Sequence, residues 1–484
     1  MKRIFYLFVL LVSASVVSLT AGAYTQEFDG NIYELSNDTA IYTFTRHPSW
    51  FDFPRYPNTY SITIHDTVWR KGTSYPVTTI SPRKSGMDQE LIFLIRIPNT
   101  VKYITDKAFA VIDPIMRIAK EVSLRVNPDN NIKVIGDSAF YDSFLTDAFS
   151  LPNITSIGKS AFEECYKLQG ISLGNALHTI KSRAFYNTGI DSITFGKSIE
   201  TIGANAFAEC WKLTSVKFVG IPAAIEAGAF ATPHERDKSY YAHPSYNDKT
   251  IPTIKNVDIS DPQKWCRVKM KSNPIVQSET FTVNGQAVSH LDVVAGKEGI
   301  ASNVFANAKN LTAIRVTGGG VIEGSAFISC TNVKDLCLEV DSIGSGAFYI
   351  SSREEYFNPK VSLRRIYSLT PTPPAVSKYA FYNYSGIILY VPAGCKDVYR
   401  RHRIWGQFSD IEESDFEGLD DIFSFESGIG DIHVDNSDIY SEDINAPTRI
   451  YTLDGRYVGD NASMLTPGIY IVRRGHVSRK IAIQ

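Results

Sequence analysis

Three short stretches of the sequence hold residue types that could do chemistry. GISLG, residues 170 to 174, matches the G-x-S-x-G pattern that places a nucleophilic serine, here Ser172, at a strained turn between a strand and a helix. HERDKSYYAH brings His234 and His243 close in sequence, and histidine is a common metal ligand. DNSDIYSED, residues 435 to 443, gathers carboxylates, whose oxygen atoms are the ligands that calcium prefers.

The spacing argues against each of these sites. Ser172 falls at an outward position in the middle of an expected strand, where neighbouring repeats carry Thr194 and Lys217, so no strained turn is expected there. The two histidines lack the H-E-x-x-H spacing that puts two imidazoles on one helical face, and the acidic stretch does not match a helix-flanked calcium loop. The sequence holds no phosphate loop, no dinucleotide fingerprint and no CxxC pair. We therefore expect no catalytic residues, no metal site and no cofactor, and an enzyme is not expected.

The elements that would position any site come from an internal repeat. Its anchor is a phenylalanine with Ile or Val five positions upstream and, in nine of ten copies, Ala immediately before it. Regular copies are 21 to 23 residues apart, and the largest gap, 75 residues, separates the sixth anchor from the seventh. The ten anchors are Phe109, Phe140, Phe162, Phe185, Phe207, Phe230, Phe305, Phe327, Phe348 and Phe381.

Each regular copy continues with an L-x-x-L-x-L pattern. After Phe207, these positions are filled by Leu213, Val216 and Phe218, and they are the core positions of a leucine-rich repeat. A repeat this short is one turn of a solenoid, and alternation along its strand points two apolar residues inward and one residue outward. Because one turn cannot close its own core, neighbouring turns must stack. The sequence predicts a β-rich leucine-rich repeat solenoid with short parallel strands and short helical or irregular returns.

The pattern Ile-Gly-x-x-Ala-Phe-x-x-Cys-x-x-Leu-x-x-Ile resembles the BspA-like leucine-rich repeats of bacterial surface proteins, particularly those of the Bacteroidota. The likeness covers most of the chain. DPQKWCRVKMKSNP (261 to 274) is similar to an insertion that interrupts such repeats, and LYVPAGCKDVYRRHRIWGQF (389 to 408) is similar to their terminal repeat. The resemblance implies a surface protein that binds a macromolecular ligand.

The N-terminus has the features of an export signal. Lys2 and Arg3 precede an uncharged run that ends at Leu19, and small residues follow at 21 to 23. This pattern predicts a signal peptide over residues 1 to 23, so we expect a secreted or cell-surface protein, with the periplasm as an alternative. No later segment is apolar enough to span a membrane, and the net charge of −2 creates no overall field for nucleic acid.

The remaining chain divides around the repeats. TFTVNGQAV, in the gap between the two runs of repeats, predicts an inserted β-hairpin that turns at Asn284 and Gly285. The acidic stretch after the repeats retains Ile422, Phe423 and Phe425, which could dock on the solenoid. The expected segments are an N-terminal β-rich segment (24–90), the solenoid (91–410) with an insertion at about 231–295, an acidic linker (411–446) and a C-terminal β module (447–484).

The last segment predicts two hairpins. RIYTLDGRYV and GIYIVRRGHVSRKIAI each alternate in polarity around a turn, at Asp454-Gly455 and near Arg474-Gly475. With the acidic stretch before it, this segment resembles the C-terminal sorting domain of the type IX secretion route, particularly in LTPGIYIV. The resemblance implies delivery to the cell surface. We expect this segment to fold as a small C-terminal β-sandwich, and in the alternative interpretation this sandwich only caps the protein.

Six cysteines in an exported chain raise the question of disulfides. Cys165, Cys210 and Cys330 share one inward repeat position. One complete coil separates Cys165 from Cys210, so at roughly 4.8 Å per coil they would lie about 10 Å apart, beyond the reach of a disulfide. We interpret them as small buried hydrophobic residues. The sequence leaves open the pairing of Cys266, Cys337 and Cys395.

Binding is the favoured function. The outward strand positions of the repeats are mixed in type, without a charge stripe or an aromatic ladder, and the candidates among them are Lys217 and Arg315. Two loops are richer in aromatic residues, a composition typical of recognition loops, although these rings could instead pack back on the solenoid. The loop candidates are Trp50, Phe51, Tyr56, Tyr240, Tyr241 and Tyr246.

The sequence thus predicts an exported, surface-displayed leucine-rich repeat protein that mediates protein–protein interaction or adhesion. One alternative is a glycan-capturing component of a nutrient-uptake system. Another is a structural scaffold of the cell envelope. The partner is a macromolecule, a protein in the favoured interpretation and a glycan in the first alternative.

Overall fold

Two compact units make up the chain, Met1–Ser424 and Phe425–Gln484, and each is described by itself. The predicted signal peptide lies outside the residues that the structure describes. The computed structural model describes residues 24–28, 31–36, 38–45, 60–81, 92–110, 123–231, 254–350, 362–423, 448–452, 457–459, 468–474 and 477–483.

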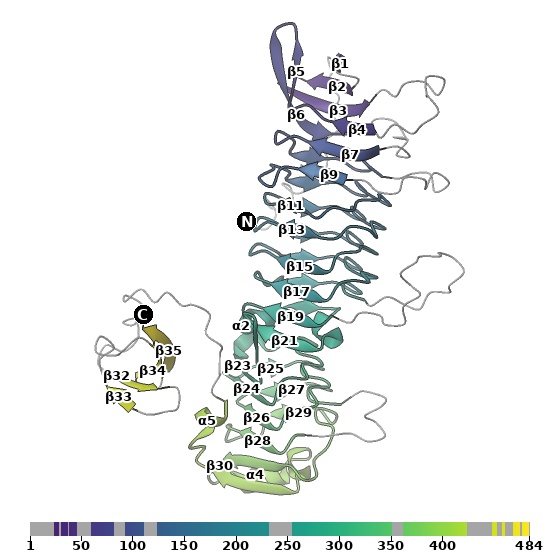
Figure 1. The fold of residues 1–484 in the computed structure, drawn as a ribbon. Helices are drawn as coiled ribbons and strands as arrows, with labels where there is room; N and C mark the ends of the chain where they lie inside the picture. Colours follow the sequence, from purple (N-terminus) through teal and green to yellow (C-terminus); the bar gives the residue numbers. More distant parts are fainter. Residues whose placement is uncertain are drawn as a thin grey trace. The chain divides into compact units, whose positions relative to one another are not determined.

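Each repeat of the first unit forms one coil with two short strands. In the coil of Phe162, the first strand is β12 (Ser156–Ile157) and the second is β13 (Ile171–Leu173), with tight turns between them. Successive coils place equivalent strands side by side, so the strands follow one another along a single stack (Figure 1). The solenoid predicted from the repeat is confirmed.

The first strands of the coils form the sheets that we call the return sheets. They are parallel and in register, so that Ile135 pairs with Ile157 and Ile157 with Ile180. The longer return sheet contains β8 (Tyr103–Ile104), β10 (Val134–Ile135), β12, β14 (Thr179–Ile180), β16 (Thr201–Ile202), β18 (Ala224–Ile225) and β20 (Lys269–Met270); the shorter contains β25 (Val321–Ile322), β27 (Ser342–Ile343) and β29 (Ala375–Val376).

The second strands form the main sheets. Their strands are longer than those of the return sheets and also pair in parallel. In stack order they are β4 (Tyr60–Thr63), β7 (Ile92–Ile97), β9 (Ser123–Val126), β11 (Phe149–Leu151), β13, β15 (Ser192–Phe195), β17 (Ser215–Phe218), β19 (Asn256–Ile259), β21 (Thr280–Val283), β23 (His290–Val294), β24 (Ala313–Thr317), β26 (Asp335–Leu338), β28 (Arg365–Ser368), β30 (Ile388–Pro392) and β31 (Asp410–Ser414).

The anchor phenylalanines form two stacks inside the solenoid. From Phe109 to Phe230, consecutive rings are stacked with centroids 5.1 to 5.5 Å apart. From Phe305 to Phe381, the distances are 5.3 to 5.6 Å. The sequence register derived from these residues is therefore the register of the stacked coils.

The turns beside each phenylalanine explain the unusual repeat pattern. In six of the ten copies, the residues two positions before and two positions after the anchor take positive φ, as Ser160 (56°) and Glu164 (65°) do around Phe162. This geometry lets three alternate N–H groups donate to the next coil: Ser160 to Ser182 at 3.0 Å, Phe162 to Ala184 at 2.7 Å and Glu164 to Tyr186 at 2.9 Å. Each coil is thereby tied to its neighbour at the turns as well as through its strands.

The region between the two phenylalanine stacks differs from the expected insertion. Strands β19 and β21 continue the main sheet in parallel, and β20 continues the return sheet. Residues 254 to 295 are therefore coils of the stack, and residues 232 to 253 lie outside the described ones. The predicted hairpin is present: β21 pairs with β22 (Gln286–Ala287) in antiparallel fashion, and Asn284 and Gly285 form the turn with φ of 50° and 78°.

A buried tryptophan follows each stack along the chain. Trp265, in α2 (Pro262–Trp265), is fully buried edge-on to Phe218, and its Nε1 donates to the carbonyl of Val304 at 2.7 Å. Trp405, in η7 (Trp405–Gln407), is fully buried edge-on to Phe381 and donates to the carbonyl of Pro374 at 2.8 Å. The motif at 261 to 274 thus adds a second tryptophan-centred element within the solenoid.

Both ends of the solenoid are built on its sheets. At the start, β1 (Tyr24–Phe28), β2 (Asn31–Ser36) and β3 (Thr39–Thr45) pair with one another in antiparallel fashion. The last of them, β3, pairs in parallel with β6 (Thr73–Ile80). In turn, β6 forms a hairpin with β5 (Thr67–Arg70) and pairs in parallel with β8. At the end, α4 (Lys396–Arg401) precedes β31, and α5 (Leu419–Phe423) follows it. The solenoid therefore extends beyond the expected boundary at 410.

The second unit contains one described sheet. Its four antiparallel strands are β32 (Thr448–Thr452), β33 (Tyr457–Gly459), β34 (Gly468–Arg474) and β35 (Val477–Ile483), in the order β33-β32-β34-β35. The two expected strand pairs are present and join in one sheet within the described residues of this unit, and the second layer of the expected small β-sandwich stays a prediction. Within the described part of the chain, no helix is long and apolar enough to cross a membrane.

Candidate binding surface

The outward side of the main sheets, which we call the main face, is a regular surface of the solenoid. Along each strand the residues flanking the middle position point into the core and the middle residue points outward; in this way Ser172 pairs with Ser150, and Cys337 with Arg315. We call these the main row. From β11 to β31, it consists of Ser150, Ser172, Thr194, Lys217, Asp258, Thr282, Asp292, Arg315, Cys337, Tyr367, Tyr390 and Glu412.

The first part of the main row is open to solvent. Ser172, Thr194 and Lys217 are exposed, and Ser150 is half-buried. Small hydroxyl side chains dominate here, and they can donate and accept hydrogen bonds. We call residues 150 to 217 of the row the open half.

Lys217 lies at the border of the open half and is held by Asp258. Its Nζ lies 3.2 Å from a carboxylate oxygen of Asp258, which is buried. The same carboxylate accepts hydrogen bonds from Thr282 Oγ1 at 2.9 Å and from the backbone N–H of Gly285 at 2.7 Å. The lysine therefore completes a network that fixes the hairpin turn, and it also presents a cation on the main face.

The last part of the main row is covered by α5. Phe423 (1% exposed) and Leu419 pack against Cys337 and Tyr367, and Phe423 meets the ring of Tyr367 edge-on at 6.1 Å. Tyr367 also stacks on Tyr390, with centroids 4.9 Å apart and planes 11° apart. The sequence prediction of a row without stacked aromatic residues misses this pair.

Arg315, a predicted binding residue, joins α5 to the sheet. Its Nε donates to Asp292 at 2.8 Å and its Nη1 to Asp420 at 2.7 Å, and its guanidinium lies 6.0 Å from the ring centre of Phe423. Burial disfavours the charged form, but the hydrogen bonds to Asp292 and Asp420 outweigh it and raise the pKa of Arg315 above its ordinary value. In this arrangement the arginine holds the chain's own segment.

The six cysteines are all described, and none is in a disulfide. Cys165 and Cys210 are both free and buried, in agreement with the prediction that they do not form a disulfide. Both thiols also donate hydrogen bonds to the carbonyl of the preceding anchor, Cys165 to Phe140 and Cys210 to Phe185, each at 3.0 Å. Burial raises the thiol pKa to about 12 for Cys165 and about 11 for Cys210, so neither is a nucleophile at neutral pH.

The catalytic patterns of the sequence gain no support. Ser172 lies in the middle of β13, a parallel rung of the main sheet, whereas the serine pattern requires a turn into a helix. His234 and His243 lie outside the described residues. Over the part of the chain that the structure describes, no group of three or more His, Cys, Asp or Glu could hold a metal ion.

The six aromatic loop candidates also lie outside the described residues, so their role stays a prediction. They are Trp50, Phe51, Tyr56, Tyr240, Tyr241 and Tyr246.

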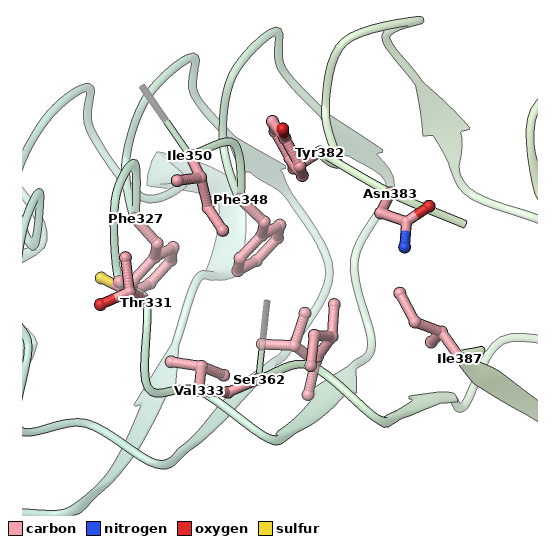
Figure 2. A pocket seen from close by; sticks show the side chains of 12 residues that line it. Phe327, Thr331, Val333, Phe348, Ile350, Ser362, Tyr382, Asn383 and Ile387 are labelled. Carbon is pink, nitrogen blue, oxygen red and sulfur yellow. The ribbon is translucent and has the colours of Figure 1, made fainter. Parts of the chain in front are cut away.

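A small pocket opens beside the second phenylalanine stack. Figure 2 shows Phe327 and Phe348 along one side of it and Tyr382 and Asn383 near its rim. Its volume is about 30 Å³, far below the roughly 300 to 1,000 Å³ of pockets that bind small molecules. The pocket is too small for an organic ligand, so the main face remains the candidate binding surface.

A family model matches about half of the chain. The BspA type leucine rich repeat region matches in six copies over residues 90–214, 133–235 and 271–370. No curated protein matches the chain.

Several solved structures are similar to this chain. A leucine rich cell surface protein from Faecalibacterium prausnitzii is 18% identical, with 85% of this chain and 100% of that chain covered and a TM-score of 0.32. The pneumococcal vaccine antigen PcpA is 18% identical, with coverage of 81% and 98% and a TM-score of 0.34. A leucine-rich repeat protein from Bacteroides ovatus is 15% identical, with coverage of 81% and 100% and a TM-score of 0.33.

Proposed function

The protein belongs to the BspA-type leucine-rich repeat family, and we propose from this that it is an exported, surface-displayed binding protein that recognises another protein through the open half of the main face. The observation that carries the proposal is the exposed run of Ser172, Thr194 and Lys217 on a rigid parallel sheet. Stacked coils present such positions at fixed spacing, which suits an extended partner surface.

The chemistry of the open half favours a protein over a glycan. Its main-row side chains offer hydroxyl groups and one cation, which suit the polar backbone and acidic side chains of a protein. Sugar faces usually rest on aromatic rings, and the described residues of the open half place none in the main row. The stacked Tyr367 and Tyr390 would offer such rings, but α5 packs over Tyr367.

Export and surface delivery are part of the proposal. The predicted signal peptide over residues 1 to 23 and the C-terminal unit, with its resemblance to a sorting domain, support them. The aromatic loops named above remain candidate contacts of the same partner.

The binding test uses two substitutions in the open half. Ser172→Arg and Thr194→Arg place bulky cations on the main face without touching the core, so binding should be lost while the fold is kept. Lys159→Ala, at an exposed position in the turn before Phe162, is the matched control. Wild-type and variant proteins are assayed against immobilised extracellular matrix proteins and on a glycan array.

We expect protein binding that both arginine variants lose and that the control keeps. Binding to glycans alone, or protein binding that the arginine variants retain, would refute the proposed surface. Surface proteolysis of intact cells, with and without residues 447 to 484, tests delivery separately. Full protection of the intact protein would confine it to the periplasm.

A further inference from the structure

The covered part of the main face has the composition of a binding groove. A sheet face meant for water carries polar side chains, as the open half does. Here the outward positions instead hold Cys337, which is fully buried, and Tyr367, with Ala313 beside them. We call these residues, with Arg315 and Tyr390, the covered groove.

The segment that covers this groove is short. α5 has five residues, and a helix of this length has little stability of its own. Its hold on the sheet depends on Leu419 and Phe423, which are four residues apart and so share one side of the helix, and on Asp420, which pairs with Arg315. Two buried apolar side chains, the partly buried Phe416 and Ile422, and one exposed carboxylate make up the contact of this short segment with the sheet.

The covering is also incomplete. Tyr390 in β30 and Leu369, directly after β28, are only partly buried, as are Phe416 and Ile422 on the covering segment. A longer helix of the same character could reach these side chains and bury more apolar surface than α5 does. Such a partner helix would compete with α5, which is present at high local concentration because it begins five residues after the end of β31.

We propose that the covered groove is a docking site for an acidic amphipathic helix of a partner protein, and that α5 is its exchangeable intramolecular occupant. The partner helix carries a large apolar residue at two positions four apart and a carboxylate directly after the first, the arrangement of Leu419, Asp420 and Phe423. The carboxylate pairs with Arg315, and the apolar residues meet Cys337 and Tyr367.

A second copy of this chain is a poorer occupant. Its α5 would leave one groove only to enter an equivalent one, so the exchange would bury no additional apolar surface. A partner helix that extends toward Tyr390 would bury surface that α5 leaves exposed. This site is separate from the open half, so it extends the proposed function without depending on it.

The test opens the groove in the full-length protein. Phe423→Ser removes the main apolar contact of α5 and leaves the sheet intact. Binding of a fluorescent peptide with the sequence of residues 415 to 424 is measured by anisotropy. We expect at least about ten-fold tighter binding to the Phe423→Ser protein than to wild type, because the competing segment is released. Adding Arg315→Gln should weaken peptide binding by about ten-fold, because the charge-assisted hydrogen bond is lost.

Thiol labelling provides the fold-independent readout. Cys337 should resist iodoacetamide in wild type, react in Phe423→Ser, and be protected again by the peptide, whereas the buried Cys165 should stay unreactive throughout and so report an intact core. A peptide with alanine in place of its phenylalanine should neither bind nor protect.

Three results would overturn the proposal. In the first, Cys337 stays unreactive in Phe423→Ser, so that α5 is not what covers the groove. In the second, Cys337 becomes reactive but the peptide does not bind. In the third, wild type forms a concentration-dependent dimer that Phe423→Ser abolishes, because the groove would then serve self-association.

Discussion

The open half and the covered groove lie on the same kind of sheet and have opposite surfaces. Behind both, stacked phenylalanines with ring centroids 5.1 to 5.6 Å apart fill the core. In front, one carries hydroxyl side chains and the other carries Cys337 and Tyr367 under a helix. The difference shows that coil stacking constrains the inward positions and leaves the outward ones free to specialise.

The largest effect should come from the shared core. Phe207→Ala and Phe327→Ala each leave a cavity between stacked rings, and each should lower the free energy of unfolding by about 3 to 5 kcal/mol. Urea unfolding of both variants, beside the surface control Lys159→Ala, measures this. An effect confined to one variant would break the comparison, because the two stacks would then not be equivalent.

A smaller loss of unfolding free energy is expected for Lys217, one of the two cations of the main row, than for the core phenylalanines. Lys217→Ala takes the cation from the buried carboxylate of Asp258 and should cost about 1 to 2 kcal/mol, because Thr282 and Gly285 continue to satisfy part of it. Urea unfolding measures this loss of unfolding free energy. When Lys217→Ala is made in a protein that already carries Asp258→Asn, most of the loss should disappear. Equal costs in the presence and absence of Asp258 would contradict the network.

Arg315→Gln provides the contrast in the covered half. Its main effect should be local, because the arginine joins α5 to the sheet, so Cys337 should label faster while the urea midpoint moves little. A large drop in the urea midpoint with no change in Cys337 labelling would show that Arg315 stabilises the solenoid as a whole and does not hold α5.

Alkaline pH should reveal the buried thiols of both stacks. The pKa of Cys165 and that of Cys330 are raised to about 12 by burial, and that of Cys210 to about 11, from an ordinary value of 9.0. The folded protein keeps these protons when the unfolded chain has lost them, so their stabilisation is complete below about pH 9 and disappears as the pH rises toward 11 to 12.

Each thiol should therefore cost about 1 kcal/mol of stability by pH 10. Urea midpoints at pH 8 and pH 10 measure the loss. Cys165→Ser is the matched control, since a hydroxyl can donate to the same carbonyl, as Ser143 does to Phe140 at 2.7 Å, without titrating in this range. A loss as large in this variant as in wild type would exclude Cys165 as a contributor.

The smallest effect should follow removal of the C-terminal unit. Stability in a repeat stack is set by neighbouring coils, and Trp405 still closes the second stack when residues 447 to 484 are deleted. The urea midpoint and the labelling rate of Cys337 should both stay close to wild type. A lower midpoint, or a newly reactive Cys337, would show that this unit contributes to the difference between the two halves.

The repeat core was predictable because the residues that define each coil lie close together in sequence. Phenylalanine anchors at intervals of 21 to 23 residues indicate the register that the rings adopt, and Asn284-Gly285 indicates the hairpin turn. The coils at 254 to 295 read as an insertion in the sequence because Ile275 stands where Phe230 stands in the preceding coil, so the phenylalanine anchor is missing there. The predicted end of the solenoid is too early because β31 carries an acidic sequence typical of a linker.

The covered groove was not predictable from the repeat alone. Asp420 lies 105 residues from Arg315 in sequence, so only the folded chain brings the pair together. Tyr367 and Tyr390 belong to irregularly spaced coils, so the repeat register does not assign them to the main row. The polar role of the repeat cysteines did have a signal, because Ser143 and Thr188 occupy the same position in alternate coils and donate to carbonyls in the same way.

The hydrogen bonds that join coil to coil also set how the solenoid would respond to force. Bonds such as Phe162 N–H to Ala184 run from one coil to the next, so tension applied to the two ends loads the few bonds of a terminal coil rather than all coils at once. The stack should then peel open in steps. Each released coil of some 22 residues would add about 75 Å of extended chain, which would let the molecule lengthen under shear while its remaining coils stay folded.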